Sequence, residues 1–221
     1  MILELLHAAA GGVFPPEDGD TEVVPAVEGA PVAVLSFTAH HVVAADLPAA
    51  EVLGHVDPED LKGPLAPGVL AWLAERTGLY AGSLDIVLAW RPERAAPSEG
   101  LAVERVERPD HPRVVRARRW RGDLEVWGET GGRGIVLIGR GLAGRLELSV
   151  EVAPQERDRG LARRLVSAAL VAAAPTEPVF AQVAAANAAS LRALQPAGFV
   201  AIGAEVLYGP VGDFFRRRRW P

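Results

Sequence analysis

The sequence predicts a mixed α/β protein with a mostly antiparallel sheet. Short apolar runs recur at hairpin spacing over residues 114–152, as in an antiparallel sheet. After Pro154 the apolar period changes from two to 3.6, which indicates a helix that follows a strand. The 221 residues, 49% of them hydrophobic, suffice for one substantial core and are short for two. We therefore expect a single domain, residues 1–221, with a less legible N-terminal part (1–110) and a better defined core (111–221).

The N-terminal part opens with few regular signals. Residues 11–31 are rich in Gly, Pro and acidic residues, which predicts a surface loop. Residues 32–44 are apolar and β-branched, as in a strand buried on both faces. Proline near a first turn predicts helices over residues 48–56 and 67–76, the second of which ends before Gly78.

The strands of the second half follow from their alternation and from turn residues. We expect them at residues 85–90, 124–129, 134–139 and 145–152, with the chain strand-like from Val114 onward. The last strand alternates plainly. One face carries Leu146, Leu148, Val150 and Val152, and the other carries Glu147, Ser149 and Glu151.

The helix after Pro154 begins near Gly160. One face carries Leu161, Leu165, Ala168, Ala169 and Ala172, and Arg163, Arg164 and Ser167 lie outside it. A further strand is expected at residues 179–183. Asn187 is well placed to cap the next helix, which ends at Gly198, and a terminal strand pair at residues 199–203 and 205–208 completes the sheet.

The turn that opens the helix has the spacing of an acyl-CoA loop: Arg157, two residues, Gly160, one residue, Ala162. Backbone N–H groups at a helix N-terminus have no intrahelical partner, and the helix dipole adds partial positive charge, so a pyrophosphate is stabilised there. Gly160 lets a phosphate oxygen approach its N–H closely, and Arg157, Arg159 and Arg163 can add charge-assisted contacts. The hexapeptide alone is weak, but it falls between a strand and an amphipathic helix.

A second constellation follows at the next strand and helix, where N-A-A-S-L-R-A-L-Q-P-A-G-F runs from Asn187 to Phe199. Together these segments resemble the GCN5-related N-acetyltransferase (GNAT) superfamily, and more closely its bacterial members, over about Glu147 to Tyr208. The resemblance implies a central mixed, mostly antiparallel sheet with helices on both faces. It also implies a strand pair that splays at the acetyl-CoA site.

The same resemblance implies acetyl-CoA as acyl donor and no metal. The backbone of Val150 and Val152 would hydrogen-bond the pantetheine arm and the acetyl carbonyl, and Asn187 and Ser190 would face the pantetheine or the thiol. The pyrophosphate would be held by the loop and the helix start, that is by Arg157, Arg159, Gly160, Leu161, Ala162 and Arg163. The expected reaction is acetyl transfer to a primary amine of a small molecule or peptide, by direct attack in a ternary complex.

Proton transfer needs a base, because an amine with a pKa near 10 is only about one part in a thousand deprotonated at neutral pH. Glu147 is the first candidate, acting through water, and Glu151 is the second. Alternatively, both are solvated strand residues that pair with Arg145 or Arg163.

The departing thiolate also needs a proton or must leave as the anion, which a pKa near 8.5 permits. Many relatives place a tyrosine seven residues after the asparagine, where this chain has Leu194. Tyr208 and Ser190 are the substitutes that the sequence offers, although Tyr208 is more often a core or sheet-edge residue.

Composition limits the other function classes. A net charge of -5 gives no general attraction to nucleic acid or to an anionic membrane, and the absence of cysteine excludes disulfides and thiolate metal sites. The five histidines lack a ligand spacing, and of His40 and His41, adjacent in an apolar strand, one must face inward. No stretch is long enough to span a bilayer, so we expect a cytoplasmic protein, for which a homodimer is common with such sheets.

Two alternatives remain open. One is a degenerate relative that binds acyl-CoA as a sensor or scaffold, which the leucine at position 194 makes reasonable. The other is a nucleic-acid-binding module that uses the basic tracts at residues 113–121 and 216–219. The identity of the amine acceptor has no readable signal.

Overall fold

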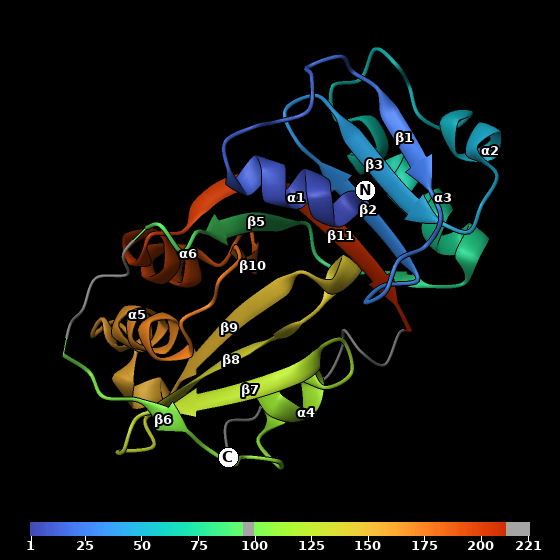
Figure 1. Cartoon of the computed structure of the whole chain (residues 1–221). Helices are drawn as coiled ribbons and strands as arrows, with labels where there is room; N and C mark the ends of the chain where they lie inside the picture. Colours follow the sequence, from blue (N-terminus) through green and yellow to red (C-terminus); the bar gives the residue numbers. More distant parts are fainter. Residues whose placement is uncertain (95–99, 211–221) are drawn as a thin grey trace. The chain divides into compact units, whose positions relative to one another are not determined.

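A computed structural model describes residues 1–94 and 100–210, which form two compact units (Figure 1). In the described part of the chain, the first unit comprises residues 1–87 and 202–210. The second comprises residues 88–94 and 100–201. The chain passes between the units within strand β5 (Asp85–Trp90) and again within strand β11 (Val200–Gly209).

The first unit contains a mixed sheet in the order β1–β3–β2–β11, with β4 also paired to β11. Strands β1 and β3 run parallel, and the other pairs are antiparallel. Besides β11, the strands are β1 (Thr21–Val24), β2 (Val32–Ser36), β3 (His41–Ala45) and β4 (Tyr80–Ala81).

The helices of this unit are α1 (Ile2–Ala10), α2 (Ala49–Leu53), the short 3-10 helix η1 (Gly63–Leu65) and α3 (Pro67–Thr77). Helices α2 and α3 confirm the two helices expected after Pro48 and Pro67. Gly78 ends α3 in the left-handed conformation, at φ 67°, which glycine adopts at little cost. Buried side chains of α2 and α3, including Val52 and Leu73, pack against β2, β3 and β11.

Three expectations for the first unit were wrong. Residues 32–44 form the hairpin β2–β3 and not one strand. The Phe37 N–H donates to the His40 carbonyl at 2.9 Å, which closes the turn between the two strands. Ala39 has the positive φ of 49°, and the turn contains none of the Gly, Asn or Asp residues that usually mark such a turn in a sequence. The expected loop at residues 11–31 contains β1, and the expected terminal strand pair is the single strand β11.

The second unit contains a sheet in the order β10–β9–β8–β7–β6, in which only β10 and β9 are parallel. Its hairpins lie where alternation and turn residues predicted them. The strands are β6 (Glu104–Arg105), β7 (Gly122–Gly128), β8 (Gly134–Arg140), β9 (Leu146–Val152) and β10 (Val179–Ala184).

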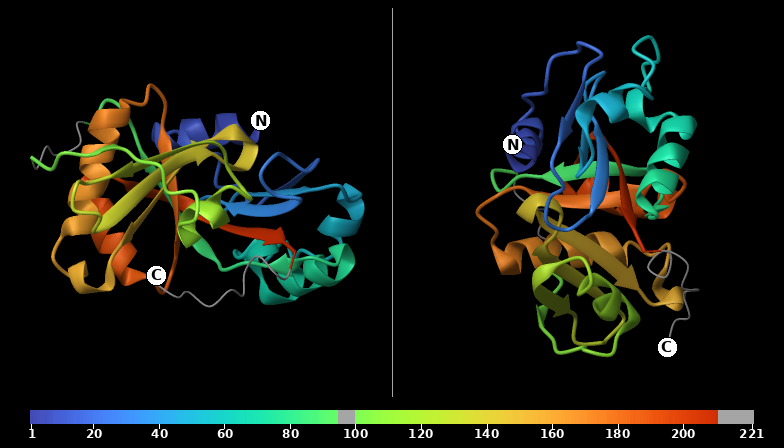
Figure 2. Two further views of the ribbon diagram at one scale, coloured as in Figure 1. Left: turned by 90° about the horizontal axis from the view of Figure 1, so that it is seen from below. Right: turned by 90° about the vertical axis from the view of Figure 1, so that its right-hand side faces the viewer.

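Helices cover both faces of this sheet. The helices are α4 (Pro112–Ala117), α5 (Leu161–Ala173) and α6 (Ala188–Leu194), with short 3-10 segments η2 (Leu142–Gly144), η3 (Pro154–Glu156) and η4 (Gln195–Ala197). Helix α5 lies along β8 and β9 (Figure 2), where a Cβ on Gly134 would meet Leu165 at 2.6 Å. On the other face, Val114 of α4 packs with Leu137 of β8. The expected mixed, mostly antiparallel fold with helices on both faces is confirmed.

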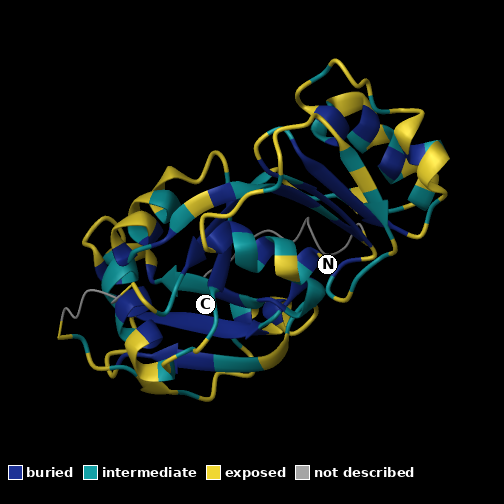
Figure 3. Cartoon of the chain, turned by 45° about the horizontal axis from the view of Figure 1, so that its top comes forward, coloured by how far each residue is buried: buried dark blue, intermediate teal, exposed yellow. Residues whose placement is uncertain are grey.

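Helix α4 replaces the strand expected from Val114. The ring of His111 accepts from the Arg113 N–H at 3.2 Å, and Pro112 occupies the first helical position, so the helix start is capped. Buried residues follow the strands, and exposed residues gather on loops and on the outer faces of helices (Figure 3).

Candidate acyl-CoA site

The turn between β9 and α5 exposes unpaired backbone N–H groups. Asp158 has φ 58° and Gly160 has φ 75°, so the chain reverses its twist twice within three residues. In the described part of the chain, the N–H groups of residues 158–160 donate to no backbone acceptor, and Gly160 caps α5 without a side-chain hydrogen bond. The N–H groups of the first helical residues lack an intrahelical acceptor by geometry. Unsatisfied N–H groups at a helix start are what an anion site requires.

The space and the charge around the turn are also suited to an anion. A Cβ added at Gly160 would meet no atom within 4 Å, so its backbone is open to a ligand. Arg157 and Arg159 are exposed beside it, and Ala162 and Arg163 are half-buried in the first turn of α5. Leu161 is buried and anchors the helix start.

The buried face of α5 is wider than its sequence indicated. Leu161, Leu165 and Ala169 are buried as expected, and Ala168 is half-buried, but Ala172 is exposed. Ser167, expected outside, is also buried, with 1% of its surface exposed. The reason is that α5 packs against both β8 and β9, so its contact surface extends past a single stripe of apolar positions.

Strands β9 and β10 separate after two paired residues. Val179 pairs with Leu146 and Phe180 with Glu147, and no later residue of β9 pairs with β10 in the described part of the chain. Although β9 lies between two strands, its residues 149–152 are only half-buried. We call the region where residues 148–152 of β9 and residues 181–184 of β10 are no longer paired the opening. The end of the pairing agrees with the strand separation that the resemblance implied, and Val150 and Val152 lie in the stretch of β9 that is not paired to β10.

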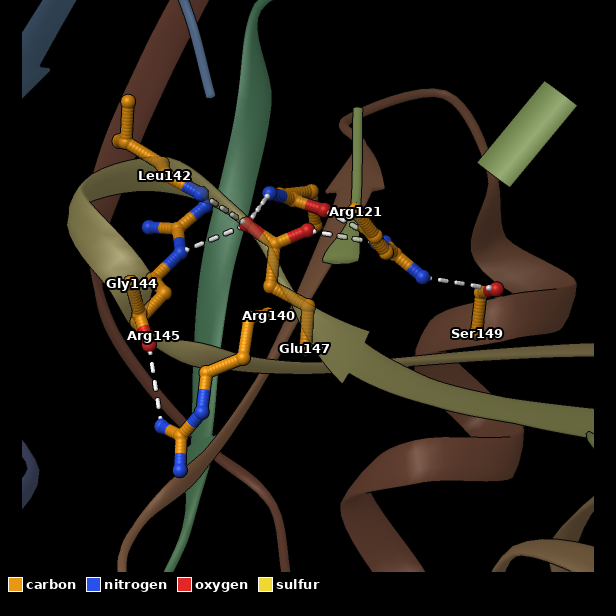
Figure 4. A network of polar contacts seen from close by, with 8 residues as sticks. Arg121, Arg140, Leu142, Gly144, Arg145, Glu147 and Ser149 are labelled. Carbon is orange, nitrogen blue, oxygen red and sulfur yellow. Dashed lines mark hydrogen bonds and ion pairs between the residues drawn. The ribbon is translucent and has the colours of Figure 1, made fainter. Parts of the chain in front are cut away.

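Glu147 lies at the head of the opening, inside a dense polar network (Figure 4). Its Oε1 accepts from the side chains of Arg145 at 2.9 Å and Gln182 at 2.7 Å, and from the Leu142 N–H at 3.2 Å. Its Oε2 accepts from Arg121 Nε at 2.8 Å. Burial by itself would raise the pKa of Glu147, but the guanidinium groups of Arg145 and Arg121 outweigh it and lower the pKa below its usual value. The carboxylate is therefore ionised at neutral pH.

The backbone leaves room for this carboxylate at one glycine. A Cβ on Gly141 would meet Cδ of Glu147 at 2.3 Å. Gly141 also donates its N–H to the Arg145 carbonyl, which closes the turn before β9. The glycine is therefore required by the position of the Glu147 side chain.

Glu151, the second candidate base, is held in the same way farther along β9. Its Oε2 accepts from Arg113 Nε of α4 at 2.6 Å, and both side chains are about one-fifth exposed. Both glutamates thus pair with arginines, Glu147 with Arg145 and Arg121 and Glu151 with Arg113 instead of Arg163, but Glu147 is buried and not a solvated strand residue. Because Arg113 and Arg121 turn inward onto β9, this part of the first basic tract is not a solvated face. The second tract, residues 216–219, lies outside the described residues.

Tyr208 belongs to the first unit. Its hydroxyl donates to the Leu70 carbonyl at 3.0 Å, and burial raises its pKa further above the usual range. Both His40 and His41 are buried in the same unit, and His40 contacts the carboxylate of Asp18 at 3.0 Å.

Asn187 and Ser190 lie together at the start of α6. The Asn187 side-chain oxygen accepts from the Ser190 N–H at 3.2 Å, which confirms Asn187 as the helix cap. Asn187 is exposed, so its amide nitrogen can still donate to a ligand. Leu194 is buried in the same helix.

Arg121 and Gln182 are the residues of this site that the sequence did not reveal. They lie 61 positions apart, and each was part of a segment that the sequence predicted only as strand. They come together only in the folded protein, where β9 pairs with β10 and the turn before β7 lies beside both strands. Within the described residues there is no group of three or more His, Cys, Asp or Glu side chains that could hold a metal ion. None of the helices described is long and apolar enough to cross a bilayer.

Comparison with known proteins gives matches only at the level of structure. No family model matches the sequence, and no curated protein matches it. The chain is similar to a GNAT-family acetyltransferase from Colwellia psychrerythraea, with 14% identity, a TM-score of 0.42, and coverage of 64% of this chain and 62% of that one.

Two further solved structures are similar. A GCN5-related N-acetyltransferase from Sphaerobacter thermophilus has 20% identity, a TM-score of 0.42, and coverage of 62% of this chain and 54% of that one. A GCN5-related N-acetyltransferase-like protein from Streptococcus suis has 11% identity, a TM-score of 0.40, and coverage of 81% and 84%. The chain thus spans between about half and two thirds of the length of the first two.

Proposed function

We propose that this protein is an acetyl-CoA-dependent N-acetyltransferase of the GNAT class that acts on a primary amine. The observation that carries the proposal is the pairing of an open, unsatisfied helix start at Gly160 with the opening between β9 and β10. The two features lie at the end of the same strand, β9. A diphosphate and an extended thioester arm need these two features in this order.

In this proposal the turn binds the diphosphate. The N–H groups of residues 158–162 donate to its oxygens, and the positive end of the α5 dipole stabilises its charge. Arg157, Arg159 and Arg163 add their guanidinium groups. Because Gly160 carries no side chain, the phosphate reaches the backbone directly.

The opening holds the thioester in the same proposal. The backbone of Val150 and Val152 hydrogen-bonds the pantetheine arm and the acetyl carbonyl, where donors stabilise the charge that develops on the oxygen during attack. Asn187 and Ser190, at the start of α6, contact the pantetheine from the β10 side.

Proton transfer is assigned to Glu147 through a water at Oε2, which accepts only from Arg121 among the described residues. Its low pKa makes it a weak base, so the acceptor amine itself sets the pH dependence of the rate. Glu151 is the second candidate and is similarly paired. The Tyr208 hydroxyl is occupied by Leu70, so the thiolate leaves as the anion, which a pKa of about 8.5 permits.

Coenzyme A binding is tested with Gly160→Glu, which puts a carboxylate where the diphosphate would lie. Gly144→Glu is the matched control, because Gly144 also has a positive φ, of 80°, and also has no atom within 4 Å of an added Cβ. Coenzyme A should raise the melting temperature of the parent and of the control but not of Gly160→Glu. Equal shifts in all three proteins would contradict the proposed site.

Transfer is tested by incubation with acetyl-CoA and a panel of primary amines, with thiol release and the mass of the acetylated amine as readouts. The proposal expects at least one amine to gain an acetyl group at a rate that Gly160→Glu reduces at least tenfold. Binding of coenzyme A without transfer to any amine of a broad panel would favour the sensor or scaffold instead.

A further inference from the structure

The guanidinium of Arg121 spans the head of the opening. Its Nη1 donates to Ser149 Oγ at 3.1 Å, and its Nη2 donates to Gln182 Oε1 at 3.2 Å. Ser149 lies two residues beyond the last paired residue of β9, and Gln182 lies two residues beyond the last paired residue of β10. The side chain therefore bridges the two strands just where they begin to separate.

The orientation of the Arg121 side chain is fixed by Glu147. Its Nε donates to Glu147 Oε2 at 2.8 Å, and Glu147 is itself held by Arg145, Gln182 and the Leu142 N–H (Figure 4). Only 11% of the Arg121 side chain and 5% of the Glu147 side chain are exposed. The guanidinium is thus a rigid group in a site from which water is largely excluded, where charge interactions are strong.

Arg121 still has binding capacity. A guanidinium carries five N–H donors, and the interactions with described residues use one at each of the three nitrogens. One N–H on each terminal nitrogen is left. The only anionic partner of Arg121 in the described part of the chain is Glu147, and that single carboxylate also serves Arg145.

An arginine with two remaining donors on adjacent nitrogens and a shared counter-charge suits a second carboxylate, which it can bind through two hydrogen bonds. Resting on the proposed acetyl transfer at the same opening, we propose that Arg121 binds a carboxylate of the acceptor. The acetylated amine then belongs to an amino acid or to a molecule with a carboxylate similarly close to its amino group. Glu147 acts on this carboxylate only through Arg121, as a positioning residue.

The test measures binding of reaction products to the coenzyme A-loaded protein by ligand-observed NMR. The probes are N-acetylated amino acids and, as matched neutral partners, their primary amides. At least one acid should bind at least tenfold more tightly than its amide. Arg121→Gln should remove this difference, and Arg121→Lys should keep part of it because it retains the charge without the two-donor geometry.

Arg105→Gln is the control, because it removes an arginine that pairs with Glu125 on β7, away from the opening. It should leave the preference for acids unchanged. The coenzyme A melting shift of every variant is measured in the same samples and reports that the variant is folded. If Arg121→Gln does not fold, the comparison of acid and amide in the parent and in Arg121→Lys still decides the matter.

The outcomes separate the two proposals. If coenzyme A does not shift the melting temperature of the parent, the proposed function is wrong. Three outcomes, each with coenzyme A bound, contradict the proposal that Arg121 binds a carboxylate of the acceptor: no acid binds, acids bind no better than amides, or Arg121→Gln retains the full preference for acids. None of these outcomes contradicts the proposed acyl-CoA site.

Discussion

Replacing Glu147 by glutamine should destabilise the protein strongly, because the change removes one charge from a buried network and keeps its shape. Glu147 accepts four hydrogen bonds, from Arg145, Arg121, Gln182 and the Leu142 N–H. A glutamine has one acceptor oxygen, so its NH₂ group must replace either Oε1 or Oε2 and then faces the donors that the replaced oxygen accepted from. Removing one partner of a buried ion pair costs about 3–5 kcal/mol, since the remaining charges stay buried.

Urea unfolding followed by tryptophan fluorescence measures this loss. For a urea dependence of about 2 kcal/mol per molar, the midpoint of Glu147→Gln should fall by about 2 M. Glu125→Gln is the matched control, because Glu125 also pairs with an arginine, Arg105, but at the surface, where a pair contributes about 0–1 kcal/mol. If Glu147→Gln loses less than about 1 kcal/mol, the network does not stabilise the fold as its geometry indicates.

Three further predictions concern single positions. Gly141→Ala should cost about 1–3 kcal/mol, because its Cβ would meet Cδ of Glu147 at 2.3 Å, and a parent-like urea midpoint would show that the turn relaxes freely. Asn187→Ala should cost about 1 kcal/mol through loss of the α6 cap, with Asn187→Ser retaining most of it; equal losses in both would argue against capping. Burial lowers the pKa of His41, so the unfolded chain takes up a proton that the folded one resists, and stability should fall as the pH drops below about 6.5. Comparing unfolding at pH 7.5 and 5.5 should show this fall, and His41→Gln should reduce it; an unchanged pH dependence would refute the assignment.

The elements with strong local signals were predictable from the sequence. Helix α5 follows from its period and from Gly160, α6 from the cap at Asn187, and the end of α3 from Gly78, because each signal lies within one turn of the structure that it determines. The hairpins of the second unit follow similarly from alternation and Gly-rich turns. The split at Ala39 was missed because its turn contains no residue that favours a left-handed backbone.

The candidate site was also predictable only where its residues are neighbours in the chain. The proposed acyl-CoA loop was predictable from the sequence, because the backbone donors that would bind a diphosphate are consecutive in the chain and therefore also close in space. The surroundings of Glu147 were not visible. Its partner Arg121 lies 26 residues away and Gln182 lies 35 residues away, and no local pattern records which strand or turn will face another.

The sequence by itself therefore determined the strand, turn and helix of the proposed anion site, since these depend on short-range backbone geometry. Only the tertiary structure decided that α4 replaces a strand, that its arginine pairs with Glu151, and that Arg121 bridges β9 and β10. These contacts depend on which faces pack together, and packing is chosen by the whole core and not by neighbours in the chain.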